Sequence, residues 1–138
     1  ELVQARYEFQ PVQGVDKLVK SCLLAAGEEG IQVRPGVDNL IYRVSVPSLS
    51  KDLLDQTGNS GYFLEYDSEN ILELREPCND PRCQTVAYIG EKKMLIPLFN
   101  AGIKGIDRVV PVGKTMDFDL IWDGYNLYER LTRIISIM

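Results

Sequence analysis

The feature that most constrains the fold is the alternation of two different apolar spacings along the chain. Residues 40–46, 62–66, 84–89 and 107–112 are rich in β-branched and aromatic side chains, a composition that favours strands. The segments between them carry apolar residues three and four positions apart, which is the spacing of a helix with one buried side. Strands and helices that alternate with short connections are typical of right-handed βαβ units. We therefore expect an α/β fold, with alternating strands and helices over a mostly parallel sheet.

The clearest helical pattern lies at residues 15–28, where Gly27 and Gly30 supply the end of the helix. We expect its apolar side to be buried, and that side consists of Val15, Leu18, Val19, Cys22, Leu23 and Ala26. A less regular candidate helix covers residues 1–11 and would end at Pro11. Further helices are expected at residues 50–56, 68–77, 91–102 and 125–138.

The chain has 138 residues, the usual size of one domain, and neither a linker nor a repeat divides it. We predict a single α/β domain over residues 1–138, with residues 1–35 as a candidate appendage of the other half of a longer protein. The sequence begins with Glu1 rather than Met, which leads us to expect a C-terminal fragment.

Charge and hydropathy argue against several partners. The formal net charge is -5, whereas domains that bind nucleic acid carry basic surfaces, so we expect no nucleic-acid partner. No apolar run approaches the ~20 residues that a membrane-spanning helix needs. Three cysteines are too few for a disulfide scaffold and fit a reducing compartment, so we predict a cytoplasmic location.

The sequence contains no histidine, which excludes Ser-His-Asp and Cys-His catalysis and the usual zinc sites within this chain. Cys78 and Cys83 form a C-x4-C pattern that could share a metal or form a disulfide. A structural zinc ion needs about four ligands, and the chain offers neither a histidine nor a second close pair of cysteines. We therefore predict ordinary thiols and no metal.

Two further groups of residues could carry chemistry. Asp117, Asp119 and Asp123 could bind Mg²⁺ or act as acid and base, but solvated loop carboxylates are the commoner meaning of such a pattern. The Trp-Asp-Gly tract at 122–124 favours an anchored start of the last helix, with Asp123 or Asn126 as cap; a role at a ligand or domain cleft is the alternative. No G-x-G-x-x-G loop follows a strand, so no phosphate-binding loop for a dinucleotide is visible.

Three tracts, about half of the chain, resemble one protein family. They are YFLEYDSENILEL (62–74), CNDPRCQTVAYIG (78–90) and GIDRVVPVGKTMDFDLIWDGYNLYERLTRII (105–135). In order and spacing they resemble the C-terminal end of the long-chain acyl-CoA reductases associated with bacterial luciferase, a branch of the aldehyde dehydrogenase superfamily. The markers are Cys-Gln-Thr at 83–85, Gly-Ile-Asp-Arg at 105–108, Pro-Val-Gly at 111–113 and Trp-Asp-Gly at 122–124.

The resemblance implies an aldehyde-dehydrogenase-like catalytic-domain fragment. In that family a cysteine thiolate takes the acyl group from coenzyme A, and NADPH (or NADH) delivers hydride to the thioester to release an aldehyde. The nucleophile and the nucleotide-binding half lie upstream in the family, which implies that this chain holds no catalytic residue and is inactive in isolation. Cys22, on the expected buried side of a helix, is the wrong place for a nucleophile. Supporting positions near the cleft are implied for Gln84, Thr85, Trp122 and Asp123.

The resemblance also implies partners: an acyl-CoA or acyl-protein substrate, an acyl-protein synthetase, and further copies of the same protein in a homo-oligomer. Two other classes of function stay open. One is a non-catalytic α/β module that binds a ligand or a partner. The other is a complete small enzyme that uses Asp117, Asp119 and Asp123 with a metal.

Overall fold

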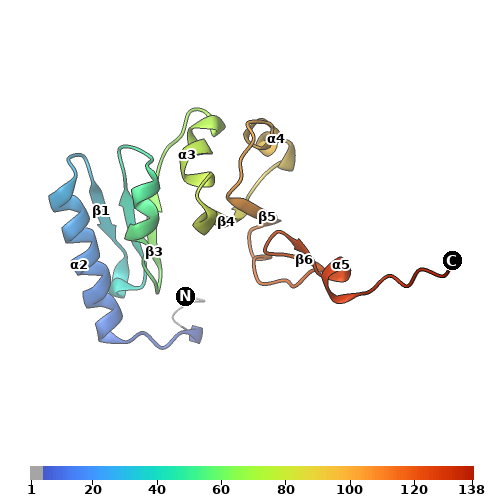
Figure 1. Ribbon diagram of the computed structural model, residues 1–138. Coiled ribbons are helices and arrows are strands. Elements are labelled where there is room, and N and C mark those ends of the chain that lie inside the picture. The colour runs from blue at the N-terminus through green and yellow to red at the C-terminus, as the bar shows by residue number, and fades with distance from the viewer. Residues whose placement is uncertain (1–4) are drawn as a thin grey trace. The chain divides into compact units, whose positions relative to one another are not determined.

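The computed structural model describes residues 5–138, which fold as a mixed α/β protein (Figure 1). The chain consists of two compact units, Glu1–Glu69 and Asn70–Met138. The expectation of one domain over residues 1–138 stays a prediction; residues 11–35 form a helix and a strand of the first unit. The candidate helix over residues 1–11 lies partly outside the described residues, and residues 7–10 are not helical.

The first unit contains a three-stranded sheet in the order β1-β2-β3. The strands are β1 (Gln32–Pro35), β2 (Tyr42–Ser45) and β3 (Tyr62–Glu65). β2 runs antiparallel to β1 and parallel to β3, with Tyr42 opposite Tyr62. The strands predicted at residues 40–46 and 62–66 are therefore confirmed. The sequence does not predict β1, because this short edge strand ends in a proline and has no apolar alternation.

Helix α2 (Pro11–Gly27) lies alongside this sheet (Figure 1). Pro11 occupies its first turn, where the missing N–H of a proline would have no helical partner in any case. The Gln13 side chain accepts a hydrogen bond of 3.0 Å from the Gln10 N–H, which fixes the N-terminal end. The helix predicted at residues 15–28 is confirmed, and it begins earlier than expected because Pro11 starts it rather than ending a preceding segment.

The buried side of α2 is not the predicted one. Its buried residues are Gly14, Lys17, Ser21 and Leu24. The predicted side, which we call the exposed stripe, consists of Val15, Leu18, Val19, Cys22, Leu23 and Ala26, and all six are exposed. The exposed fraction is 60% for Val15 and 67% for Leu23. Apolar spacing identifies one side of a helix, but the side that packs depends on the groups that the neighbouring loops present.

The core of the first unit lies between α2 and the sheet. Its buried apolar members are Leu24, Tyr42, Val44, Val46 and Tyr62. Side chains alternate along β2, where Tyr42 and Val44 are buried and Arg43 between them is exposed. The 3-10 helix η2 (Lys51–Gln56) connects β2 to β3 and packs Leu53 on this core. It occupies the position of the helix predicted at residues 50–56.

The second unit contains a parallel pair of strands, β4 (Gln84–Tyr88) and β5 (Ile106–Pro111). They are connected through η5 (Lys92–Leu95) and α4 (Ile96–Asn100), with Pro97 in the first turn of α4. Three short helices precede β4, namely η3 (Ile71–Leu74), α3 (Arg75–Cys78) and η4 (Pro81–Cys83). The two predicted strands are confirmed. The helices predicted at residues 68–77 and 91–102 are present as short 3-10 and α segments.

The last helix is much shorter than predicted. Strands β6 (Ile121–Trp122) and β7 (Tyr125–Asn126) form a hairpin, and only α5 (Leu127–Leu131) follows it. The Asn126 side chain accepts a hydrogen bond of 3.1 Å from the Tyr128 N–H, so Asn126 rather than Asp123 is the cap. Residues 132–138 are not helical, and Ile134 is 99% exposed. A short helix without packing partners is unstable, which explains the early end.

Parallel neighbours occur in both units, but the sheets are small. Residues 5–138 form one sheet of three strands and two sheets of two strands. The α/β class is thus confirmed in its coarse form, while the described strands are not joined into one mostly parallel sheet. The apolar pattern gives the order of strands along the chain, but it does not specify which strands become neighbours.

The ammonium group of Lys17 joins α2 to the loops of the sheet. Its Nζ donates hydrogen bonds to the backbone carbonyls of Asn39, Leu40 (3.0 Å) and Ser60 (2.8 Å). The side chain is fully buried, with an exposed fraction of 0%. Burial lowers the pKa of Lys17 below its usual value, because a charge is costly to remove from water. Three carbonyl acceptors match the three protons of an ammonium group and offset that cost.

We expect Lys17→Met to lower the free energy of unfolding by about 3 kcal/mol, because it leaves buried carbonyls without a donor. Lys20→Met is the matched control on the same helix. Lys20 donates to one carbonyl, of Thr57, at 3.1 Å, and pairs with Asp16 at 3.5 Å with a side chain 35% exposed. Its replacement should cost less than about 1 kcal/mol. Chemical denaturation of both variants measures the difference, and equal losses would contradict the role assigned to Lys17.

Candidate functional site

Gln84 and Thr85, two of the residues selected from the sequence, are the first residues of β4. Gln84 lies opposite Ile106 and Thr85 opposite Arg108, so one residue of β5, Asp107, is left over between the two pairs as a bulge. Gln84 has a φ of 31°, a value that residues with a side chain rarely adopt. The entry into β4 is therefore a distorted position, held by pairing with β5.

Trp122 contacts the same part of β5 through Arg108. The Arg108 guanidinium carbon lies 4.2 Å from the centre of the Trp122 ring, a cation–π contact, and the Phe118 ring stacks on Trp122 at 5.3 Å. The guanidinium also donates to the carbonyls of Thr115 at 3.2 Å and Asp117 at 2.8 Å. Arg108 thus binds both the hairpin and the loop that precedes it.

Asp123 lies in the turn of the β6–β7 hairpin. The sequence analysis placed it at the start of the last helix, and that prediction is wrong. Asp123 and Gly124 have φ values of 48° and 74°, and two positive values are what a tight hairpin turn of the Asp-Gly type requires. A Cβ on Gly124 would lie 2.7 Å from a carboxylate oxygen of Asp107. The positive φ and this close approach together favour glycine at position 124.

Three of the four residues selected from the sequence therefore pair with or contact one short stretch of β5, residues 106–108, and Asp123 directly precedes Gly124, which approaches Asp107. We call this arrangement the Arg108 cluster; its members are Gln84, Thr85, Asp107, Arg108, Phe118, Trp122 and Asp123. Sequence reasoning missed Arg108 as the connecting residue. The available signal was the adjacent charged pair Asp107 and Arg108 inside a strand whose other residues are apolar. The cluster combines the Arg108 guanidinium, the Asp107 and Asp123 carboxylates and the aromatic rings of Phe118 and Trp122.

The three cysteines lie in different surroundings. Cys22 is exposed on α2, which corrects the expectation that it is buried. The other two form a pair, with Cys78 Sγ 4.0 Å from Cys83 Sγ. Cys83 directly precedes Gln84, so this pair adjoins the Arg108 cluster in the chain.

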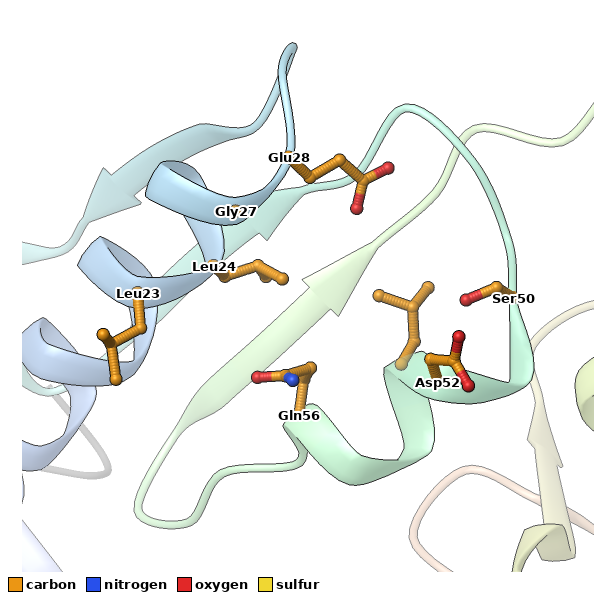
Figure 2. Close-up of a pocket in the computed structure, with 8 residues that line it drawn as sticks. Leu23, Leu24, Gly27, Glu28, Ser50, Asp52 and Gln56 are labelled. Carbon is orange, nitrogen blue, oxygen red and sulfur yellow. The ribbon is translucent and has the colours of Figure 1, made fainter.

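A cleft of about 410 Å³ lies in the first unit, between the end of α2 and η2. Figure 2 shows Glu28 on one wall and Asp52 on the other, with Leu24 directed into the space between them. Ser48 donates a hydrogen bond of 3.2 Å to the Glu28 carboxylate. Apolar side chains and two carboxylates would suit a ligand with a cationic group and an apolar part. This cleft could not be predicted from the sequence, because its walls come from two separate segments.

Asp117 and Asp119, which precede the hairpin, each have a partner close by in the chain. Asp117 pairs with Lys114 at 2.9 Å, and Asp119 accepts the N–H of Leu120 at 2.6 Å. Within residues 5–138, no group of three or more histidine, cysteine or acidic residues is placed to hold a metal ion. The structure therefore does not assemble Asp117, Asp119 and Asp123 into the metal site that was one alternative.

No protein-family model, curated protein or solved structure matches this chain. In the part of the chain that the structure describes, no helix is both long and apolar enough to cross a membrane.

We expect Arg108→Met to lower the free energy of unfolding of the second unit by about 2 kcal/mol, because it removes a cation–π contact and two charge-assisted hydrogen bonds. Trp122 is the one tryptophan of the sequence, so its fluorescence reports on this contact during denaturation. Arg130→Met is the control, since Arg130 lies 5.3 Å from the Tyr125 ring on an exposed helix. That change should stay within about 0.5 kcal/mol. A similar effect of both changes would refute the central position of Arg108.

Proposed function

We propose that this chain is the C-terminal portion of an NAD(P)H-dependent acyl-CoA reductase, which converts a fatty acyl thioester to an aldehyde through a cysteine thioester intermediate. The observation that carries the proposal is a coincidence between the sequence and the structure. The tracts at 78–90 and 105–135, which carry most of the family resemblance, supply every member of the Arg108 cluster. Thr85 and Trp122, which come from separate tracts of the resemblance, thus both neighbour Arg108.

The proposal assigns the chain a supporting part in the reaction. NADPH or NADH supplies hydride when bound to the whole enzyme, but this chain has no glycine-rich loop after a strand with which to hold its phosphates. We assign the thiolate to the longer protein as well. The Arg108 cluster would position Gln84, Thr85, Trp122 and Asp123 at the edge of the acyl or nicotinamide cleft and help exclude water there.

Two features of the fold support a larger protein around this chain. The exposed stripe of α2 is a row of apolar side chains that soluble proteins usually cover. The parallel pairs β2–β3 and β4–β5 are the type of neighbours found inside larger α/β sheets, which are covered on both faces. We propose that each pair is part of an aldehyde-dehydrogenase-like catalytic domain that is completed by the longer protein. A cytoplasmic homo-oligomer that accepts acyl-CoA or an acyl group from a synthetase completes the proposal.

A non-catalytic binding module is the second candidate. The cleft beside Glu28 and Asp52 favours it, because that cleft lies in the first unit and involves none of the residues that carry the resemblance to a reductase. The two candidates differ in the reading frame upstream of this chain. A nucleotide-binding loop and a reactive cysteine there support the reductase, and their absence supports the module.

In the longer protein, we expect Trp122→Ala to reduce turnover by more than its loss of stability explains. Trp122→Phe keeps an aromatic face for Arg108 and is the matched control, with turnover closer to that of the unchanged protein. Unfolding free energy and aldehyde formation are measured on the same preparation. If the unfolded fraction accounts for the whole loss of turnover, Trp122 only anchors the hairpin and the cleft assignment is wrong.

Asp123→Asn separates the charge of Asp123 from its backbone conformation. Asparagine accepts positive φ as readily as aspartate, so the hairpin turn should lose less than about 1 kcal/mol. With the fold intact, reduced turnover means that the cleft uses the carboxylate charge, and unchanged turnover removes Asp123 from the proposed supporting residues.

A further inference from the structure

Cys78 and Cys83 differ in their access to solvent, although their sulfur atoms are only 4.0 Å apart. Cys78 ends α3 and is 5% exposed, whereas Cys83 ends η4 and is half-buried. An external reagent can therefore reach Cys83 first. The buried partner thiol lies 4.0 Å from it.

The loop between the two cysteines is held by hydrogen bonds within the loop and by one from Gly105. The Asp80 side chain accepts hydrogen bonds of 2.9 Å from the backbone and the side chain of Arg82, and the Asp80 carbonyl accepts one of 3.0 Å from the Cys83 N–H. The Gly105 N–H donates to the Cys78 carbonyl at 3.1 Å. Gly105 is buried there, and a Cβ at this position would lie 2.6 Å from the Cys78 carbonyl oxygen. These hydrogen bonds hold the backbone of the loop that carries both thiols.

The two thiols of the pair also differ in pKa. The hydrogen bond with Cys78 lowers the pKa of Cys83 to about 7, against the opposing effects of burial and of the Asp80 carboxylate. Arg82 is paired with that carboxylate at 2.9 Å. The same hydrogen bond, together with burial, raises the pKa of Cys78. At neutral pH the accessible sulfur is therefore the one that ionises.

We infer that Cys78 and Cys83 form a reversible thiol–disulfide site that reacts with low-molecular-weight disulfides, with Cys83 as the attacking sulfur and Cys78 as the resolving sulfur. The site needs neither an acyl substrate nor a dinucleotide, so it is independent of the proposed reductase function. Sequence reasoning weighed a disulfide here and favoured ordinary thiols, because spacing alone does not reveal the distance between two sulfurs or their unequal exposure.

The reaction with glutathione disulfide balances in two steps. The Cys83 thiolate attacks one sulfur of glutathione disulfide, a Cys83–glutathione bond forms, and the first glutathione leaves as a thiolate that takes up a proton. Cys78 then loses its proton and attacks Cys83 Sγ, which releases the second glutathione. Two cysteine thiols are oxidised by two electrons, and one glutathione disulfide is reduced to two thiols. Excess reduced glutathione reverses both steps.

Formation of the bond changes the start of β4. A disulfide has a sulfur–sulfur distance of about 2.05 Å, so the two side chains must move closer than the 4.0 Å that now separates them. Cys83 is followed directly by Gln84, whose φ of 31° is already unfavourable. Oxidation is therefore expected to shift Gln84 and Thr85 against β5.

The test is oxidation of the complete chain carrying Cys22→Ser, which removes the exposed third thiol and with it disulfides between molecules. The protein is equilibrated with mixtures of reduced and oxidised glutathione, quenched with acid and examined by peptide mass spectrometry. We expect a peptide linked through Cys78 and Cys83, and its loss when reduced glutathione is added back. Two free thiols, or glutathione left attached to Cys83 at full oxidation, would overturn the inference.

Substitutions of Cys78 establish the order of attack. With Cys78→Ala, the mixed disulfide of Cys83 with glutathione should accumulate, because no resolving sulfur remains. Its formation at neutral pH should be about fivefold slower than the first step in the chain that retains Cys78, since loss of the S–H donor returns Cys83 toward an ordinary thiol. Cys78→Ser retains a hydroxyl donor and should restore most of that rate without resolving the adduct. Failure of Cys83 to form the adduct in Cys78→Ala would overturn its assignment as the attacking sulfur.

Discussion

The hydrogen bonds of the buried Lys17 ammonium group are the interaction on which the first unit depends. They connect α2 to the turn before β2, through Asn39 and Leu40, and to the turn before β3, through Ser60. The centres of the Phe9 and Tyr42 rings lie 4.9 Å and 5.5 Å from the same nitrogen, so its surroundings combine carbonyls and aromatic faces. Because the helix must present Lys17 to these loops, it directs Leu24 into the core and leaves the exposed stripe outside.

The sequence predicted elements well and their packing poorly. The strands at residues 42–45, 62–65, 84–88 and 106–111 were found because alternation and β-branching are local properties. The prediction of which side of α2 faces the core was wrong, because a lysine among small residues is not the usual pattern of a buried helix side. The predicted length of the terminal helix was wrong because apolar residues at helical spacing do not by themselves ensure packing. Residues 132–138 are exposed and not helical.

For the candidate site, too, the sequence indicated individual residues but not the contacts between residues that are far apart in the chain. Gln84, Thr85, Trp122 and Asp123 could be selected from the sequence by resemblance, but the contact of Trp122 with Arg108 could not be predicted, because it joins a strand and a distant hairpin. The cleft between α2 and η2 and the proximity of the two cysteine sulfurs also required coordinates. Spacing along a chain indicates which residues could act together; it does not give their distances.

Two kinds of chemistry thus lie next to each other in the second unit. The Arg108 cluster positions residues at the start of the parallel pair β4–β5, and the cysteine pair precedes it in the chain without taking part in acyl transfer under our account. The oxidation state of the pair would reach the cluster through Gln84, which belongs to both neighbourhoods. This arrangement makes the start of β4 the position where thiol chemistry and the proposed reductase function meet.

The central claim is that the chain supports an acyl-transfer reaction whose nucleophile lies elsewhere in the longer protein. The most direct measurement is to incubate that protein with a labelled acyl-CoA in the absence of reduced nicotinamide cofactor, and to locate the acyl group by peptide mass spectrometry. The account predicts a thioester on a cysteine upstream of Glu1, with Cys22, Cys78 and Cys83 unmodified. An acyl group on one of these three cysteines, or no acylated cysteine at all, would contradict it.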